Sequence, residues 1–214
     1  MKIAVMYSGQ FRTLDSCFEN HVSNLIDPFL ENGHDVDIFA SLHAGNRDHE
    51  FCLNWMQEKK FRKFELVETQ ESNEENFGSL PKFGMFENWL KQIYSLKNSF
   101  KLIESDYDLV VRCRTDLLLS CKVELVEDLI DGSIFIPDHD NWTGYNDRFA
   151  MGTYEKMKIY CDLCENLSSG RITGSNAESY LRSHLDLENV SIKRTRVEVT
   201  RLRLDGQIEP VRYS

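Results

Sequence analysis

The first forty residues contain an apolar strand, an amphipathic helix and a second apolar strand, and this order limits the fold more than any other feature. The opening run, "KIAVMYSG" (2–9), ends at a glycine that permits a turn. Apolar residues then recur at helical spacing through 14–30, with Pro28 expected to kink the helix and Gly33 to end it. The second strand, "DVDIFASL", covers 35–42. This order favours two parallel strands joined by a right-handed crossover.

The remaining sequence continues to alternate between strands and helices. We expect strands at 64–68 and 133–137, an extended stretch through 110–116, helices at 86–103, near 153–166 and near 176–185, a short helical or turn segment near 123–130, and a β-prone tail. The polar stretch 70–84 is predicted to be a mobile surface loop of the kind that often covers a site. The fold class is therefore α/β, with a sheet that is parallel at least in its first half, and 214 residues suit a single domain.

Charge and hydropathy exclude several classes of protein. A formal net charge of -10 argues against a surface built to grip nucleic acid, although a local basic site remains possible. No run of eighteen apolar residues occurs, so we expect no transmembrane segment. The N-terminus becomes polar too early for a signal peptide, which favours a cytoplasmic location. The six cysteines are expected to be free thiols, and the lone pair Cys161 and Cys164 lacks the second pair of a zinc site.

The turn after the first strand holds the first candidate binding residues. In open α/β sheets ligands bind beyond the carboxyl ends of the strands. Ser8 and Gly9 form a small turn there, Gln10 offers an amide, and Arg12 offers a guanidinium suited to phosphate. The fragment is neither a GxGxxG sequence nor a Walker loop, so a plain strand-to-helix turn with an exposed arginine stays open as the alternative.

A charged trio follows a buried strand in "DLVVRCRTDLLLS" (108–120). If the chain stays extended, Arg112, Arg114 and Asp116 share one face of the strand. Two arginines and one aspartate leave a positive charge that needs an anion. One interpretation is a structural ion pair with the second arginine in solvent. The other is a site where the arginines hold a diphosphate and Asp116 binds a divalent cation.

"YDLVVRCRTDLLLS", together with "YSGQFR" and "NDRFAMGT", resembles the small GT-A-fold glycosyltransferases of viral and bacterial surface-glycan synthesis. In that family an Asp-x-Asp motif holds Mn²⁺ or Mg²⁺ on the diphosphate of a nucleotide sugar. The resemblance implies a single GT-A-like domain with a nucleotide-binding half (1–120) and an acceptor-side half (121–214). It also implies Asp116 as the metal ligand. Arg114 stands where the first aspartate of the motif is expected.

A literal Asp-x-Asp occurs at Asp138 and Asp140, directly after a predicted strand, and His139 between them also suits a transition metal. In the resembled fold, however, a short apolar strand continues the metal motif. The leucines at 117–119 provide one, whereas the residues at 141–143 do not. We therefore rank Asp116 first and treat 138–147 as an acceptor-side loop, with a solvated turn as the alternative.

The loop that follows supplies candidates for catalysis. By the resemblance, Asn146, Asp147 and Arg148 line the donor sugar and the acceptor. A carboxylate near the acceptor hydroxyl would serve as general base, and Asp147 is our first choice. Glu178 is the second, although a glutamate in that place is commonly a first-turn helix residue.

The basic tail "KRTRVEVTRLR" (193–203) has two interpretations: it closes over the diphosphate, or it forms an edge strand protected by charge.

The sequence thus predicts a glycosyltransferase that moves a sugar from a UDP- or GDP-sugar to a hydroxyl of a glycan or glycoconjugate. The predicted nucleotide-binding residues are Ser8, Gly9, Gln10, Arg12, Arg112 and Arg114, with Asp116 binding Mn²⁺ or Mg²⁺. Two alternatives remain: a nucleotide-sugar or glycan-binding module without turnover, and an unrelated α/β nucleotidyltransferase.

Overall fold

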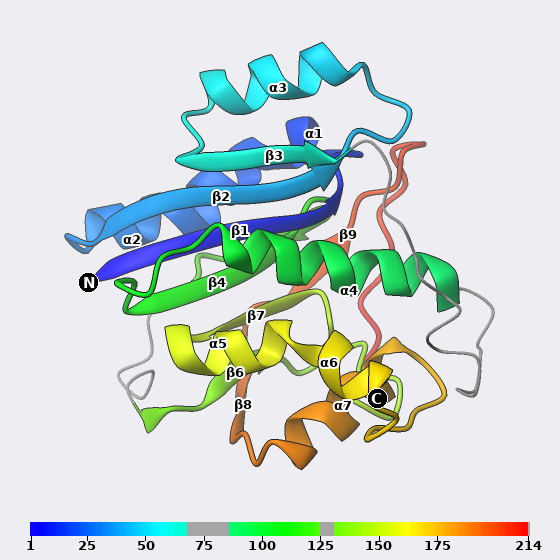
Figure 1. Cartoon of the computed structure of the whole chain (residues 1–214). Helices are drawn as coiled ribbons and strands as arrows, with labels where there is room; N and C mark the ends of the chain where they lie inside the picture. The colour runs from blue at the N-terminus through cyan, green and yellow to red at the C-terminus, as the bar shows by residue number, and fades with distance from the viewer. Residues whose placement is uncertain (68–85, 125–130, 214) are drawn as a thin grey trace.

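The computed structural model describes residues 1–67, 86–124 and 131–213 (Figure 1). Its sheet begins with four parallel strands: β1 (Lys2–Gln10), β2 (Asp35–His43), β3 (Lys63–Val67) and β4 (Leu109–Arg114). They lie in the order β3-β2-β1-β4, with β1 hydrogen-bonded to both β2 and β4. This half of the sheet confirms the expected parallel strand–helix–strand start.

The second half of the sheet is mixed. Its strands are β7 (Phe149–Thr153), β6 (Ile134–Pro137) and β8 (Ile192–Thr195), which complete a seven-stranded sheet in the order β3-β2-β1-β4-β7-β6-β8. β7 runs antiparallel to both β4 and β6, whereas β6 and β8 are parallel. Two short strands, β5 (Leu117–Leu119) and β9 (Val199–Arg201), pair antiparallel in a separate small sheet.

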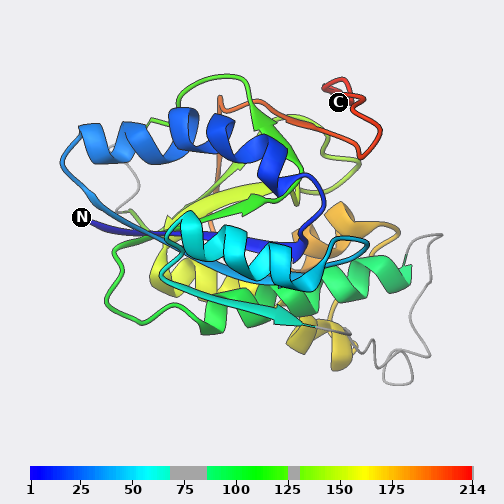
Figure 2. The same cartoon turned by 90° about the horizontal axis from the view of Figure 1, so that it is seen from above.

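Helices cover both faces of the large sheet, which gives three layers (Figures 1 and 2). One face carries α1 (Leu14–His21), the π-helical segment η1 (Val22–Ile26), α2 (Asp27–Glu31) and α3 (His49–Glu58). The other face carries α4 (Phe86–Lys101), α5 (Tyr154–Cys161), α6 (Leu163–Ser168) and α7 (Ala177–Leu187). None of the helices in the described ranges has the length and apolar content needed to cross a membrane.

Each face of the sheet has its own hydrophobic core, because successive side chains of a strand point to opposite faces. In β1, Ile3 and Val5 belong to the core under α1 and α3, whereas Ala4 and Met6 belong to the core under α4. All four are fully buried. A strand buried on both faces is apolar throughout, which is why this part of the sequence is easy to recognise.

Several local predictions are confirmed, and two elements were missed. The helix after the first strand passes through the π-helical segment just before Pro28, and Gly33 follows it with φ of +76°. All six cysteines are free. The sequence pattern did not predict α3, and the segment that forms β7 was expected to be a polar loop that leads to a helix. The predicted loop at 70–84 and most of the predicted segment at 123–130 lie outside the described residues.

Two buried serines of α4 connect that helix to the carboxyl ends of β1 and β2. The Ser95 hydroxyl accepts a hydrogen bond from the Gly9 N–H (2.6 Å) and donates to the Ser41 carbonyl (2.8 Å). One helical turn later, the Ser99 hydroxyl donates to the Tyr7 carbonyl (2.7 Å) and accepts from the Ser41 N–H (3.0 Å). The two hydroxyls thus fix α4 against the strand ends from which the Gly9 turn emerges.

Replacing Ser99 with alanine should reduce the free energy of unfolding by about 1–3 kcal/mol, because it leaves buried backbone groups without their partner. Urea denaturation measures the change. Ser168→Ala, at an exposed position on α6, is the matched control and should stay within about 0.5 kcal/mol of the parent. Equal stabilities of the two variants would contradict the bridging role of Ser99.

Candidate functional site

A polar cleft of about 370 Å³ lies beyond the carboxyl ends of β1, β2 and β4. Its lining consists of Ser8, Gly9, Gln10, Arg12, His43, Asn88, Lys91, Gln92, Arg114, Thr115 and Asp116. Six of these are predicted site residues from two distant parts of the sequence. The structure brings them together because β1 and β4 are adjacent parallel strands whose ends meet at one edge of the sheet.

The turn after β1 has an unusual backbone. Gly9 has φ of +107°, and Arg12 has φ of +42°, a left-handed conformation that costs free energy in any residue other than glycine. The Arg12 Nε donates to the Gln10 side-chain oxygen (2.8 Å). Ser8 is 3% exposed, and its hydroxyl has no hydrogen-bond partner among the described residues. A buried hydroxyl without a partner on the cleft wall is suited to a polar ligand.

Asp116 lies in the turn between β4 and β5, where three arginines surround its carboxylate. Arg114 donates through Nε to Oδ1 (3.1 Å) and through Nη2 to Oδ2 (3.2 Å). Arg201, from β9, donates to Oδ2 through Nε (3.3 Å) and Nη2 (3.2 Å). Arg12 adds a longer contact to Oδ2 (3.4 Å). Asp116 is only 2% exposed, so the guanidiniums supply the hydrogen bonds that water would give to an exposed carboxylate.

Burial alone would raise the pKa of Asp116, but the charges of Arg114, Arg201 and Arg12 outweigh burial and hold the pKa well below its usual range. Asp116 is therefore ionised at neutral pH and already fully engaged. Among the described residues no cluster of three or more His, Cys, Asp or Glu side chains could hold a metal.

A cation at Asp116 would also meet the arginines, and like unit charges 4 Å apart near a protein surface repel by about 4 kcal/mol. These residues do not fit a protein-held Mn²⁺ or Mg²⁺. The structure contains no observation that tests the metal expected at Asp116, but the chemistry of the surrounding residues argues against it.

Arg112 lies apart from the cleft. It shares a strand face with Arg114 but sits one pleat earlier, under α4, where it is 1% exposed. Its Nε and Nη1 have no hydrogen-bond partner in the described part of the chain. It borders a cavity of about 20 Å³ together with Asp147, a space suited to about one water molecule. Arg112 therefore does not line the cleft that Arg114 lines, and its role in phosphate binding stays a prediction.

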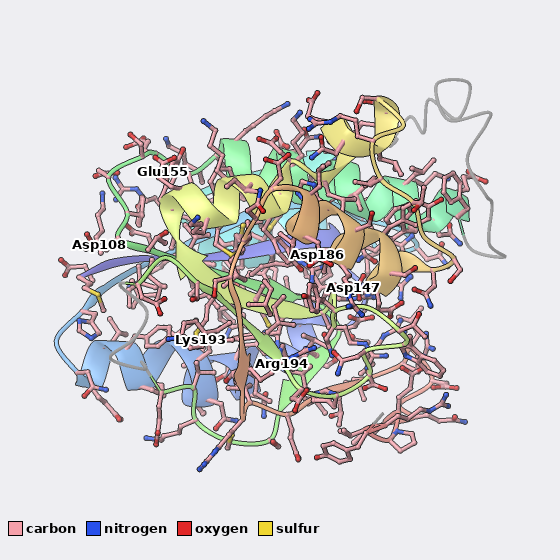
Figure 3. All side chains as sticks on the ribbon, turned by 90° about the horizontal axis from the view of Figure 1, so that it is seen from below. Asp108, Asp147, Glu155, Asp186, Lys193 and Arg194 are labelled. Carbon is pink, nitrogen blue, oxygen red and sulfur yellow. The ribbon has the colours of Figure 1, made fainter. Side chains whose placement is uncertain are left out.

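Asp147 does not line the cleft, but it contacts Gln92, which does. Its carboxylate accepts a hydrogen bond from the Gln92 amide nitrogen (2.7 Å), and the Gln92 oxygen accepts one from Arg114 Nη1 (3.2 Å). Figure 3 shows Asp147 beside α7, at the opposite end of the sheet from Asp108, which precedes β4. Gln92 of α4 thus connects the arginine cluster to the predicted catalytic carboxylate.

Glu178 lies in the first turn of α7, but it does not cap the helix, since the capping box consists of Asn176 and Ser179. Burial first, and the negative charge of Asp147 second, raise the pKa of Glu178 to about 7. The helix N-terminus alone would lower the pKa of Glu178, so burial and Asp147 outweigh the helix dipole. A Cβ on Gly144 would lie 1.9 Å from the Glu178 carbonyl oxygen, so only glycine permits this approach of loop and helix. The Tyr145 N–H also donates to the Glu178 carbonyl (3.1 Å), so the loop that leads to Asp147 is held against the first turn of α7.

The second Asp-x-Asp candidate is occupied by structural contacts. Asp140 is 4% exposed and accepts a hydrogen bond from Arg148 Nη1 (2.9 Å), and it contacts His139 Nδ1 (3.1 Å). His139 Nε2 accepts from the Val199 N–H (3.1 Å). Asn146 is fully buried and donates to the His139 carbonyl (2.8 Å). These side chains shape the predicted acceptor-side loop from within.

Two site residues were missed or left unspecified. Gln92 carries no sequence signal, since it is one polar residue on an amphipathic helix. Arg201 belongs to the basic tail, for which closure over the diphosphate and an edge strand were both considered. The structure places Arg201 on β9, paired with β5, with its guanidinium at Asp116.

The raised pKa of Glu178 predicts a pH-dependent stability. The folded protein holds this proton up to a pH of about 7, whereas an unfolded glutamate releases it near its ordinary value of 4.5. The stabilisation is complete below the lower value and is lost as pH rises through the upper one. Glu178→Gln should therefore be more stable than the parent at pH 8 by about 3 kcal/mol, but not at pH 4.5. Urea denaturation at both pH values tests this, and parallel pH profiles would contradict it.

Comparisons with known proteins agree with the observed architecture. The apo structure of mouse xyloside xylosyltransferase 1 matches with a TM-score of 0.51 and 9% identity, over 91% of this chain and 85% of that chain. An active-site mutant of LgtC matches with a TM-score of 0.53 and 15% identity, over 90% of this chain and 72% of that chain. These matches confirm the GT-A-like fold. No curated protein matches the sequence.

One family model matches residues 49–202, which is more than half of the chain. The matched range runs from α3 to the residue after β9, so it includes Gln92, Arg114, Asp116, Asp147 and Arg201. The chain belongs to the family described as Domain of unknown function (DUF7796).

Proposed function

We propose that this protein is a glycosyltransferase that moves a sugar from a nucleoside diphosphate sugar to a hydroxyl group of a glycan or glycoconjugate. The observation that carries the proposal is the arginine-lined cleft at the carboxyl ends of β1 and β4, with the Asp147 carboxylate hydrogen-bonded to Gln92 of its lining. The GT-A-like fold supports the same class of donor through the ligand position usual for α/β sheets.

The donor would bind through the turn after β1 and the turn after β4. Ser8 offers a buried hydroxyl, and Gln10 an amide, to the nucleoside or sugar. Arg12 and Arg114 offer guanidiniums, which suit the oxygen atoms of a diphosphate. Negative charge grows on the diphosphate as the bond to the sugar breaks, so cations held in place beforehand stabilise the transition state.

Asp147 and Glu178 supply the proton acceptor in this proposal. The acceptor oxygen attacks the anomeric carbon, the bond from that carbon to the diphosphate breaks, and the hydroxyl proton passes to a carboxylate. A general base works best when its pKa lies near the working pH, and the pKa of about 7 fits Glu178 to this role. Asp147, which accepts a hydrogen bond from Gln92, helps to keep the pKa of Glu178 raised through its negative charge.

Isothermal titration calorimetry with UDP- and GDP-sugars tests donor binding, and slow hydrolysis of a bound donor tests turnover. Asp147→Asn and Glu178→Gln should each lower hydrolysis by about 100-fold, the usual contribution of a general base, with donor affinity changed less than threefold. Asp186→Asn, an exposed carboxylate of the same helix as Glu178, is the matched control and should retain full hydrolysis.

Other results would favour the two alternatives. Tight donor binding with no hydrolysis and no transfer to any hydroxyl acceptor would indicate a binding module, and release of pyrophosphate would indicate a nucleotidyltransferase. Failure to bind any nucleotide sugar would refute the proposed function.

A further inference from the structure

We propose that the arginine cluster around Asp116 binds the diphosphate group directly and takes the place of a divalent cation. The inference rests on the proposed function, since it concerns how the same cleft holds a nucleoside diphosphate. It differs from the metal site that the sequence resemblance implied. Three independent features of the site support it: its net charge, its preformed geometry and its unused hydrogen-bond donors.

The charge of the cluster matches the ligand. Four guanidiniums, those of Arg12, Arg114, Arg201 and Arg203, face two carboxylates, Asp116 and Glu209, to which the ion pairs of the cluster connect them. Two positive charges are therefore in excess. The diphosphate of a nucleotide sugar carries one negative charge on each phosphate, so it would neutralise this excess. A divalent cation would instead double it.

The other charged groups nearby form no ion pair with these four arginines within the described residues. Asp205 lines the adjoining hollow with Arg203, but its carboxylate accepts a hydrogen bond from the Gln207 N–H (3.0 Å). Lys91 lines the cleft from α4 and is paired with Glu87 on the same helix. Asp147 lies behind Gln92, which separates it from Arg114 by a relay of two hydrogen bonds. His43 completes the charged or ionisable lining from β2.

The guanidiniums are held in place before any ligand arrives. Asp116 fixes Arg114 through two N–H groups and Arg201 through two more. The backbone fixes the same corner, because the Asp116 carbonyl accepts a hydrogen bond from the Leu202 N–H (2.8 Å). The Thr13 hydroxyl in turn donates to the Leu202 carbonyl (3.3 Å). Arginines held in this way lose little conformational entropy when an anion binds.

The cluster also retains donors for a ligand. Arg12 uses Nε on Gln10 and Nη1 on Asp116, and its Nη2 has no acceptor within the described ranges. The side chain is 35% exposed and lines the cleft. The hydroxyl of Ser8, 3% exposed on the same wall, likewise has no partner among the residues described. Asp116 therefore has a positioning role: it orients cations that bind the anion.

Calorimetric titration with UDP and GDP, each with EDTA and with Mn²⁺, tests the inference. For whichever of UDP and GDP binds more tightly, the dissociation constant measured in EDTA should lie within threefold of the one measured with Mn²⁺. Arg12→Gln and Arg201→Gln should each weaken binding in EDTA at least tenfold, whereas Arg12→Lys, which keeps the charge at a partly exposed position, should lose less than Arg12→Gln. Arg62→Gln is the matched control. Arg62 also pairs with an aspartate, Asp37, but it precedes β3 and so lies at the amino end of that strand, away from the cleft at the carboxyl ends.

The outcomes separate this inference from the proposed function. Binding that requires Mn²⁺ would overturn the inference and leave the proposed function intact. Binding in EDTA that Arg12→Gln and Arg201→Gln leave unchanged would also overturn it, provided that circular dichroism shows both variants folded. Absence of binding of either nucleotide in both conditions would overturn the inference and the proposed function together.

Discussion

The buried carboxylate of Asp116 is the interaction on which the functional end of the molecule depends. It joins three segments that are far apart in the sequence: the turn after β1, the turn after β4 and the C-terminal strand β9. Removing one member of such a buried ionic group leaves the remaining charges uncompensated, which commonly costs about 3–5 kcal/mol. Asp116 therefore acts both as a structural centre and as the group that decides where the cationic side chains point.

The change of strand direction in the sheet explains why the second half of the chain reaches this centre. β1 and β4 are parallel, so their carboxyl ends deliver Arg12 and Arg114 to one edge. β7 runs antiparallel to β4, so the loop before β7 starts from the same edge and brings Asp147 there. Helix α4 crosses over this edge and connects the two halves through Gln92. One antiparallel strand thus places carboxylates from the second half beside cations from the first.

Much of this arrangement could be predicted from local sequence. Buried parallel strands are continuous apolar runs, which revealed the first half of the sheet and the residues that follow its strands. β7 was missed because its pairing with β4 and β6 is non-local and its short sequence, with Gly152, resembles a loop. Alternation places Arg112 and Arg114 on the same face of β4, yet Arg112 is buried under α4, whereas Arg114, the last residue of the strand, lines the cleft. Gln92 depends on helix rotation, which no local pattern specifies.

Opposite environments shift the pKa values of Asp116 and Glu178 in opposite directions. Guanidiniums hold the pKa of Asp116 far below that of an ordinary carboxyl group, whereas burial and the charge of Asp147 raise the pKa of Glu178 to about 7. Because their pKa values differ so widely, Asp116 carries a permanent negative charge, whereas Glu178 exchanges its proton near neutral pH. The permanent charge organises cations, which suits anion binding. The charges of Arg148 and Arg114 act to lower the pKa of Glu178, but burial and the charge of Asp147 outweigh them. A carboxyl group that exchanges its proton near neutral pH therefore coexists with a strongly cationic cleft.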